Sequence, residues 1–137
     1  MAYWLMKSEP YVYSWAQLVK DKSNNWDGVR NHTAKRNLMS MQLGDLAFFY
    51  HSNEGMEIVG VMRISKLAHP DPSDKTGKFV QVGVVPVAPF PTPVTLKAIK
   101  AEPRLADMAL VKLSRLSVQP VTSAQWKLIC QMGGYKA

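Results

Sequence analysis

Short apolar runs separated by turn-forming residues give this chain the pattern of a β-rich domain. Runs rich in β-branched and aromatic residues predict strands over residues 3–7, 46–50, 57–64, 80–87 and 116–121. The run 46–50 is continuously apolar, which predicts a strand buried on both faces. Gly60 and Gly83 fall inside strands, where glycine indicates a bulge or a sharp bend.

Capping residues in front of short amphipathic segments mark the helices. Ser14, with Gln17 as its capping-box partner, predicts a helix over 15–20. Asn31 predicts a helix that continues to about residue 41, and Thr95 a short one that stops before Pro103. A last helix begins after Thr122, again with a capping-box glutamine.

Two stretches are predicted to be irregular. Residues 21–25 form a polar loop, and residues 86–93 carry four prolines that keep the chain extended. Five or six short strands with small helices at their connections predict an α+β fold, namely a small, partly open β-barrel flanked by helices. The length of 137 residues, without a domain-scale linker, predicts a single domain over 1–137.

The cysteine content and the lack of long apolar runs indicate in which cellular compartment the protein is expected. The single cysteine, Cys130, makes an intramolecular disulfide impossible and favours a reducing compartment: the cytoplasm, or the nucleus in a eukaryotic cell. No apolar run approaches the ~20 residues of a membrane span. The first residues lack the basic segment of a signal peptide, so neither secretion nor a membrane partner is expected.

Charge is distributed unevenly along the chain. The net charge is +7, yet residues 1–74 hold eight Lys or Arg and eight Asp or Glu. Residues 75–137 hold nine Lys or Arg and only two acidic residues, which accounts for the whole excess. A basic face of this kind favours a polyanion, because binding releases condensed counterions. A solvated basic surface without a partner is an equally good interpretation of charge alone.

The spacing of residues in the sequence gives little support for a catalytic site or a metal site. The three histidines and the single cysteine form no CxxC or HxxxH pair, so no metal and no cofactor are predicted. Ser8, His51 and Asp45 can be combined into a triad on paper, but no nucleophile elbow surrounds Ser8. Cys130 lies on the apolar face of the last helix, as a small core residue does. We therefore expect no enzyme.

The segment 26–31 carries the first candidate binding residues. Trp26 precedes a glycine turn, and Arg30 stands at the start of a helix whose cap is Asn31. The free N–H groups of a helix N-terminus suit a phosphate or a carbonyl oxygen. A plain N-cap beside a core tryptophan explains the same residues, and on this segment alone it is the better explanation.

Two strand ends supply further candidates. Glu9 ends the first strand, where a carboxylate can accept a hydrogen bond from a base amino group. The segment 49–52 alternates aromatic and polar residues, and aromatic faces stack on bases for roughly 1–3 kcal/mol each. An exposed strand end and ordinary core packing are the respective alternatives.

Taken in order, these pieces resemble the EVE domain family, a branch of the PUA-like superfamily related to YTH domains. The matching residues cover nearly the whole chain: 3–10, 13–14, 26–31, 34, 41, 44–45, 49–52, 60, 71–72, 105–108 and 114–121. The resemblance implies a PUA-like β-barrel with flanking helices. It also implies a pocket for one modified base, such as methylated or hydroxymethylated cytosine, in DNA or RNA.

The resemblance also implies where the base is held. Related YTH domains use the end of the first strand and the turn into the following helix. The strand end 49–52 and the stretch 115–117 are expected to line the same cleft. The loop before Phe79 is shorter than in most members, so Trp26 or Tyr50 is expected to supply the stacking face. The expected binding residues are Ser8, Glu9, Trp26, Val29, Arg30, Asn31, Tyr50, His51, Ser52, Arg115 and Ser117.

The prediction is thus a non-catalytic nucleic-acid-binding domain that takes a flipped, modified base. Glu9 is expected to accept from an exocyclic amine, while Asn31 or backbone N–H groups donate to a ring carbonyl. Flanking phosphates are expected to contact Lys97, Lys100, Arg104 and Lys112. Two alternatives remain: a general RNA-binding PUA-like module, revealed by preference for RNA over DNA, and a small-molecule sensor or enzyme, revealed by turnover of a nucleotide.

Overall fold

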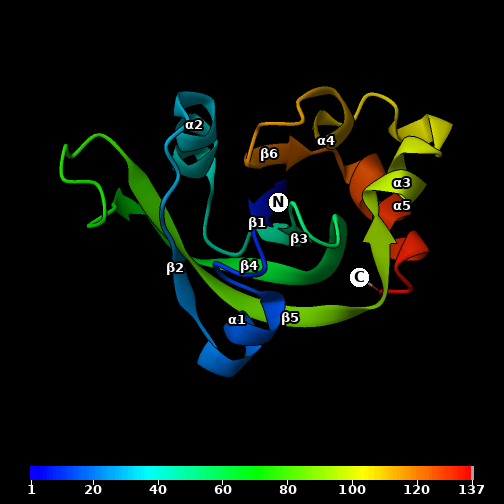
Figure 1. The fold of residues 1–137 in the computed structure, drawn as a ribbon, viewed down its shortest axis with the longest axis horizontal. Coiled ribbons are helices and arrows are strands. Elements are labelled where there is room, and N and C mark those ends of the chain that lie inside the picture. The colour runs from blue at the N-terminus through cyan, green and yellow to red at the C-terminus, as the bar shows by residue number, and fades with distance from the viewer. Residues whose placement is uncertain (137) are drawn as a thin grey trace.

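One six-stranded sheet forms the centre of the computed structural model, which describes residues 1–136 (Figure 1). Its strands are β1 (Tyr3–Ser8), β2 (Asn24–Trp26), β3 (Leu46–His51), β4 (Glu57–Pro70), β5 (Val80–Thr95) and β6 (Val118–Val121). Their order in the sheet is β2-β5-β4-β3-β1-β6. Neighbours pair antiparallel except β1 and β3, which run parallel, so β1 lies between β3 and β6.

Short helices connect the strands. They are α1 (Trp15–Asp21), α2 (His32–Ser40), α3 (Leu96–Lys100), the 3-10 helix η1 (Pro103–Leu105), α4 (Ala109–Lys112) and α5 (Ser123–Met132). The caps predicted for α1, α2, α3 and α5 are confirmed, since each accepts a backbone N–H of the first turn: Ser14, Asn31, Thr95 and Thr122. None of the helices within residues 1–136 has the length and apolarity needed to cross a membrane.

The sheet has a hydrophobic core on each face. Ala47 and Phe49 of β3 belong to a cluster with Trp26 of β2. Phe48 of β3 belongs to the opposite cluster with Trp126 of α5. Successive side chains of a strand point to opposite faces, so β3 fills both cores. The prediction that this strand is buried on both faces is confirmed.

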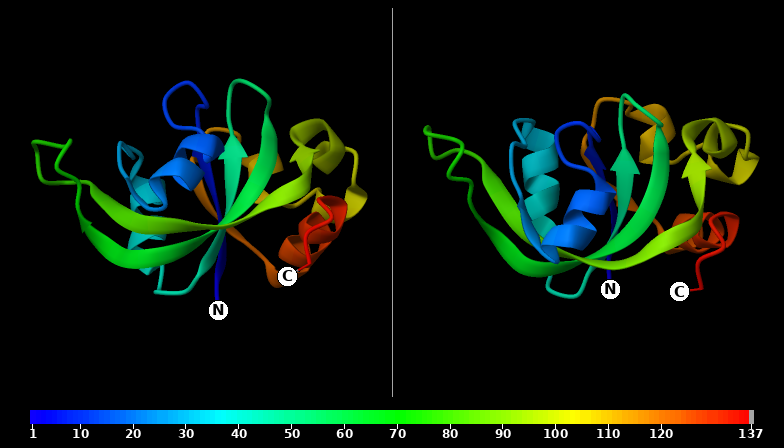
Figure 2. Two further views of the ribbon diagram at one scale, coloured as in Figure 1. Left: turned by 90° about the horizontal axis from the view of Figure 1, so that it is seen from below. Right: turned by 60° about the horizontal axis from the view of Figure 1, so that its bottom comes forward.

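The sheet is strongly curved (Figure 2), and its two edge strands, β2 and β6, lie on either side of helix α2 (Figure 1). Helix α2 lies in the gap between them, and Asn37 of α2 donates from Nδ2 to the carbonyl oxygen of Val118 in β6 (2.7 Å). The helix thus supplies a hydrogen-bond partner for a backbone carbonyl on the free edge of β6. The predicted α+β fold with five to six strands and flanking helices is confirmed, and over residues 1–136 the sheet stays open along this gap.

Three local predictions need correction. The loop predicted over 21–25 contains β2, which forms because it pairs with Val82–Val84 of β5. The proline-rich stretch 86–93 is part of β5. It lies beyond the segment of β5 that pairs with β2, so one edge of the strand is free there, and a proline, which has no N–H, costs little. The side chain of Gln17 donates to Asp21 (2.8 Å) instead of closing a capping box.

Gly60 marks a bulge, as predicted. The register shifts beside it both in the β3–β4 pairing and in the β4–β5 pairing. The ring of Trp15 lies directly over the glycine, so a Cβ atom built at this position would be 2.7 Å from two ring carbons. This close approach fixes where α1 packs on the sheet, beside the cavity described below.

Gly60→Ala is expected to lower the free energy of unfolding by about 1–3 kcal/mol, the usual cost of overpacking a core. The Trp15 ring packs edge-on against Phe49 (5.6 Å between centroids), so it has little room to retreat. Urea denaturation followed by tryptophan fluorescence measures the change. Gly60 does not have a positive φ, so a loss of stability in Gly60→Ala reports the steric contact and not backbone strain. Unchanged stability in Gly60→Ala would refute the contact.

Candidate functional site

A cavity of about 430 Å³ opens where β1 and β3 end. Because these strands are parallel neighbours, their carboxyl ends lie at the same side of the sheet (Figure 2). Curvature brings β2 to the other side of the opening, and the loop before β6 closes the third side. The volume falls within the roughly 300–1,000 Å³ range of small-molecule sites, large enough for one flat heterocycle.

Part of the predicted binding set meets at this cavity. Its walls include six of the eleven residues expected from the sequence: Ser8, Glu9, Trp26, Ser52, Arg115 and Ser117. They come from four separate segments, the end of β1, strand β2, the turn after β3 and the loop before β6. The fold therefore brings sequence-distant strand ends together, although their role in binding stays a prediction.

The other five expected residues lie outside the cavity walls. Val29 is buried in the core with Trp26, and Tyr50 is buried in the core on the opposite face of the sheet. Arg30 points toward the β4–β5 loop, and Asn31 uses its side-chain oxygen to cap α2 by accepting from Ala34 (2.9 Å). The stacking face expected from Trp26 or Tyr50 is therefore available from Trp26 alone.

His51, the fifth of these residues, organises the wall behind the cavity. Its Nε2 accepts a hydrogen bond from the backbone N–H of Trp15 (3.1 Å), which orients the start of α1. Burial lowers the pKa of His51, and the nearby carboxylate of Glu57 opposes this only partly. The imidazole is therefore neutral near pH 7, as an acceptor must be.

Several cavity residues were not predicted. Asn24 and Asn25 belong to β2, whose polar residues do not predict a strand. Val12 and Tyr13 lie in the loop between β1 and α1. Others directly adjoin predicted residues, so extending each motif by one or two positions finds them: Lys7, Asp27, Gly28, Asn53 and Ser114.

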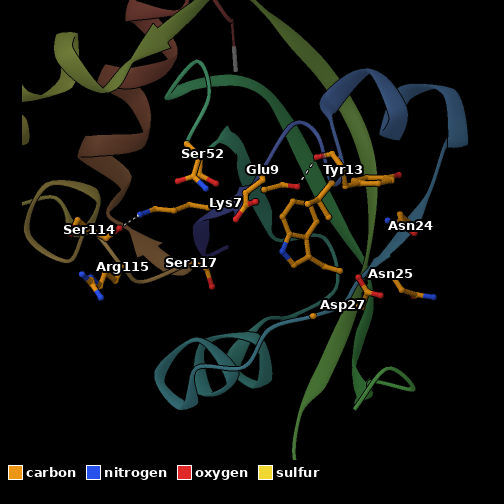
Figure 3. A pocket seen from close by; sticks show the side chains of 15 residues that line it. Lys7, Glu9, Tyr13, Asn24, Asn25, Asp27, Ser52, Ser114, Arg115 and Ser117 are labelled. Atoms are coloured by element: carbon orange, nitrogen blue, oxygen red, sulfur yellow. Dashed lines mark hydrogen bonds between the residues drawn. The ribbon is translucent and has the colours of Figure 1, made fainter. Parts of the chain in front are cut away.

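Lys7 fixes one wall of the cavity. Its Nζ donates to the carbonyl oxygen of Ser114 (2.7 Å), and its backbone N–H donates to that of Ser117 (2.8 Å). Figure 3 shows the side chain reaching from β1 toward Ser114, with Glu9 beside it. Burial lowers the pKa of Lys7. The loop that carries Arg115 is thus attached to β1 at two points.

Trp26 provides an aromatic surface with a fixed orientation. Its ring packs edge-on against Phe49 (5.3 Å between centroids), and only 6% of the residue is exposed. Among residues 1–136 its indole N–H has no hydrogen-bond acceptor, and the residue lines the cavity. A largely buried indole N–H usually has a hydrogen-bond partner. A molecule in the cavity can supply that partner.

Asp71 holds the turn that follows Trp26. Its carboxylate is buried and accepts from the Gly28 N–H (2.8 Å), from Arg30 (3.2 Å), and from both the N–H and the hydroxyl of Ser73 (2.8 and 2.6 Å). Burial alone would raise the pKa of Asp71, but the hydrogen bonds from Ser73, Gly28 and Arg30 outweigh it and lower the pKa. The β4–β5 loop is thereby anchored to the cavity wall.

Ser8, His51 and Asp45 do not form a catalytic triad. Ser8 Oγ donates to the carbonyl oxygen of Tyr13 (2.6 Å), and His51 is occupied by the N–H of Trp15. Asp45 precedes β3 at the opposite end of the sheet, where it accepts from the Trp4 indole (3.1 Å). Burial raises the pKa of Cys130 to about 11, so its thiol is unreactive at neutral pH.

The basic residues expected to hold phosphates differ in their surroundings. Arg104 pairs with Glu102 (2.6 Å) and Lys112 with Asp107 (2.9 Å). Lys97 and Lys100 lie exposed on α3. Arg115, also exposed, is the basic residue of the second half that directly lines the cavity.

Known proteins resemble this chain over nearly its whole length. A solved structure from Rhodopseudomonas palustris is 60% identical, covers 98% of this chain and 94% of its own, and superposes with a TM-score of 0.92. Human THYN1 protein, solved in complex with 5-methylcytosine containing DNA, is 31% identical with a TM-score of 0.90 and full coverage of both chains. Thymocyte nuclear protein 1 of Mus musculus is 35% identical over 95% of this chain and 73% of its own length.

The family assignment follows from sequence and structure together. The EVE domain profile matches residues 2–132, which is nearly the entire chain. The superposition on human THYN1 confirms the PUA-like α+β fold that the strand pattern and the ordered motifs predicted. The chain belongs to the EVE domain family.

Proposed function

We propose that this chain is a non-catalytic nucleic-acid-binding domain whose cavity takes one modified base, with 5-methylcytosine in DNA as the first ligand to test. One observation carries the proposal: a base-sized cavity joins an oriented indole, Trp26, to a carboxylate, Glu9, at the end of β1. The resemblance to human THYN1, solved with 5-methylcytosine containing DNA, supports this choice of ligand.

The cavity offers the contacts that a cytosine ring needs. The face of Trp26 stacks on the heterocycle, which contributes roughly 1–3 kcal/mol. The Glu9 carboxylate accepts from the exocyclic amine, the usual pairing of an acidic side chain with cytosine. A backbone N–H group of the cavity wall donates to the ring carbonyl, in place of Asn31, which caps α2.

Basic side chains are expected to hold the nucleic-acid backbone on either side of the bound base. Lys7 and Arg115 line the cavity itself, and Lys97 and Lys100 add charge on α3. Arg104 and Lys112 are already paired with acidic residues and contribute less. Such contacts fix the position of the nucleic acid without reading its sequence, and they make affinity fall as salt rises.

Titration with oligonucleotides tests the proposal. Burying one additional methyl group is worth about 0.8 kcal/mol, so methylated cytosine is expected to bind roughly fourfold tighter than cytosine. Glu9→Gln is expected to weaken binding of the methylated oligonucleotide by roughly tenfold, because an amide replaces a charged acceptor with a weaker one. Asp107→Asn removes the same charge from an exposed ion pair and is the control: because it releases Lys112, affinity is expected to stay the same or to rise slightly, and not to fall.

Three outcomes contradict parts of the proposal. Equal affinity for methylated and unmethylated DNA would remove recognition of the modification. Tighter binding to RNA of the same sequence would favour a general RNA-binding module, since a 2′-hydroxyl contact produces such a preference. Turnover of a nucleotide by the purified protein would show that the domain is catalytic.

A further inference from the structure

An exposed apolar tip stands at the mouth of the cavity. Tyr11 and Val12, in the loop between β1 and α1, are 67% and 73% exposed. Val12 also lines the cavity. Adjacent apolar side chains exposed at the rim of a cavity favour a binding surface, because burying them from water is favourable. Within residues 1–136 neither side chain belongs to a hydrophobic core, and the Tyr11 hydroxyl accepts from Asn53 Nδ2 at 3.5 Å.

The tip is held rigidly by its own backbone. The N–H groups of Val12 and Tyr13 both donate to the carbonyl oxygen of Glu9 (2.9 Å each). Ser8 Oγ donates to the carbonyl oxygen of Tyr13 (2.6 Å), which closes the base of the loop on β1. A rigid tip loses little conformational entropy when it binds. The loop therefore presents Tyr11 and Val12 in a prepared orientation beside Glu9.

We propose that the Tyr11–Val12 tip enters a base-paired duplex and fills the space left by the base that moves into the cavity. This inference rests on the proposed function. A base in the cavity has left its stack, and the unstacked step costs a few kcal/mol. An apolar wedge beside the departing base replaces part of the lost stacking, and Tyr11 supplies an aromatic ring for it.

Charge around the tip fits a nucleic acid as its partner. Residues 10–14 carry no charged side chain, so the tip itself does not repel a polyanion. Lys7 and Arg115 line the same cavity as Val12 and can contact the backbone on either side of the opened step. The exposed Leu113, next to Ser114, adds an apolar side chain to the loop on another side of the opening.

The test compares one methylated cytosine in two settings: in a single strand, and in a fully paired duplex. The variants are Tyr11→Ser, whose exposed side chain is not part of the cavity wall, and a double variant with Val12→Ser added, which also alters a cavity-lining side chain. In both variants we expect affinity for the duplex to fall roughly tenfold, because only the duplex leaves a gap to fill. Affinity for the single strand is expected to change less than about twofold in Tyr11→Ser, and to fall less than duplex affinity in the double variant. Leu43→Ser, at a residue 62% exposed before the opposite end of β3, is the matched control.

A fluorescent base gives a second readout. With 2-aminopurine next to the methylated cytosine in the duplex, wild-type protein is expected to raise its fluorescence as the neighbour unstacks. The double variant is expected to raise it less at saturating protein. The proposal is overturned if either variant loses equal affinity in both settings, if it loses none, or if the wild type does not bind the duplex.

These outcomes are separable from the proposed function. A wild type that binds the methylated single strand better than the unmethylated one supports base recognition whatever the double variant does. A wild type without that preference contradicts base recognition directly. If the tip instead docks a protein, the double variant binds both nucleic acids as the wild type does, which is among the overturning results.

Discussion

Trp126→Ala is expected to lower the free energy of unfolding by about 3–5 kcal/mol, the cost of deleting a large buried aromatic side chain. Trp126 is 1% exposed, and its ring stacks on Phe48 (3.8 Å between centroids) and on Tyr3 (4.6 Å). These rings tie helix α5 to the sheet on the face opposite the cavity. Urea denaturation monitored by circular dichroism measures the loss.

Trp126→Phe is the informative companion variant. The indole Nε1 of Trp126 is buried and has no hydrogen-bond partner among residues 1–136. Phenylalanine keeps an aromatic ring against Phe48 and removes this unpaired donor, so we expect a loss of less than about 1.5 kcal/mol. Equal losses in both variants would contradict this account, because they would mean that a phenyl ring recovers none of the packing of the indole.

Asp71→Ala is expected to cost about 3 kcal/mol at pH 7, because it leaves a buried set of donors without an acceptor. The carboxylate side chain is fully buried, while its partner Arg30 remains 42% exposed. Asp71→Asn is expected to be destabilising as well. Each oxygen of Asp71 faces donors, so the amide NH₂ opposes an N–H in either orientation. Asp107→Ala, which breaks an exposed ion pair with Lys112, is the control and costs less than about 0.5 kcal/mol.

The pH dependence of Asp71→Ala gives an independent check. The pKa of Asp71 is lowered from its usual 3.8 on folding, so the unfolded chain binds this proton more tightly than the folded one. The carboxylate therefore contributes its full stability above pH 3.8 and loses it as the pH falls through the lower, folded-state value. The difference between wild type and variant is expected to be constant from pH 5 to 7 and to shrink toward pH 3. A difference between wild type and variant that does not change with pH across this range would contradict a stabilising role for the charged Asp71 carboxylate.

Local chemistry explains which elements the sequence predicts well. An N-cap acts through its own side chain within one helical turn, so Asn31 and Thr122 mark helix starts without knowledge of the fold. Strand β2 was missed for the opposite reason. Asn24 and Asn25 have low strand propensity, and their pairing with β5 depends on residues almost sixty positions away.

The candidate site was only partly predictable for a similar reason. Strand ends are visible in the sequence, and the parallel pairing of β1 with β3 brings Ser8 and Ser52 to one opening. Which face a strand residue occupies depends on register, and Tyr50 points to the core opposite the cavity. Asn31 shows a second limit, because its sequence suits both a cap and a ligand contact, and the structure uses it as a cap.

The central place of β1 has a consequence for synthesis of the protein. Tyr3 pairs with Leu46 on one side and with Val121 on the other. Strand β1 therefore leaves the ribosome before either partner, and β6 follows only after all the elements between them have been translated. Until then the nascent chain exposes Trp4, Leu5 and Met6, an extended apolar segment of the kind that chaperones recognise. Completing this pairing closes a very long loop, so we expect folding to be slower than in helical domains of equal length.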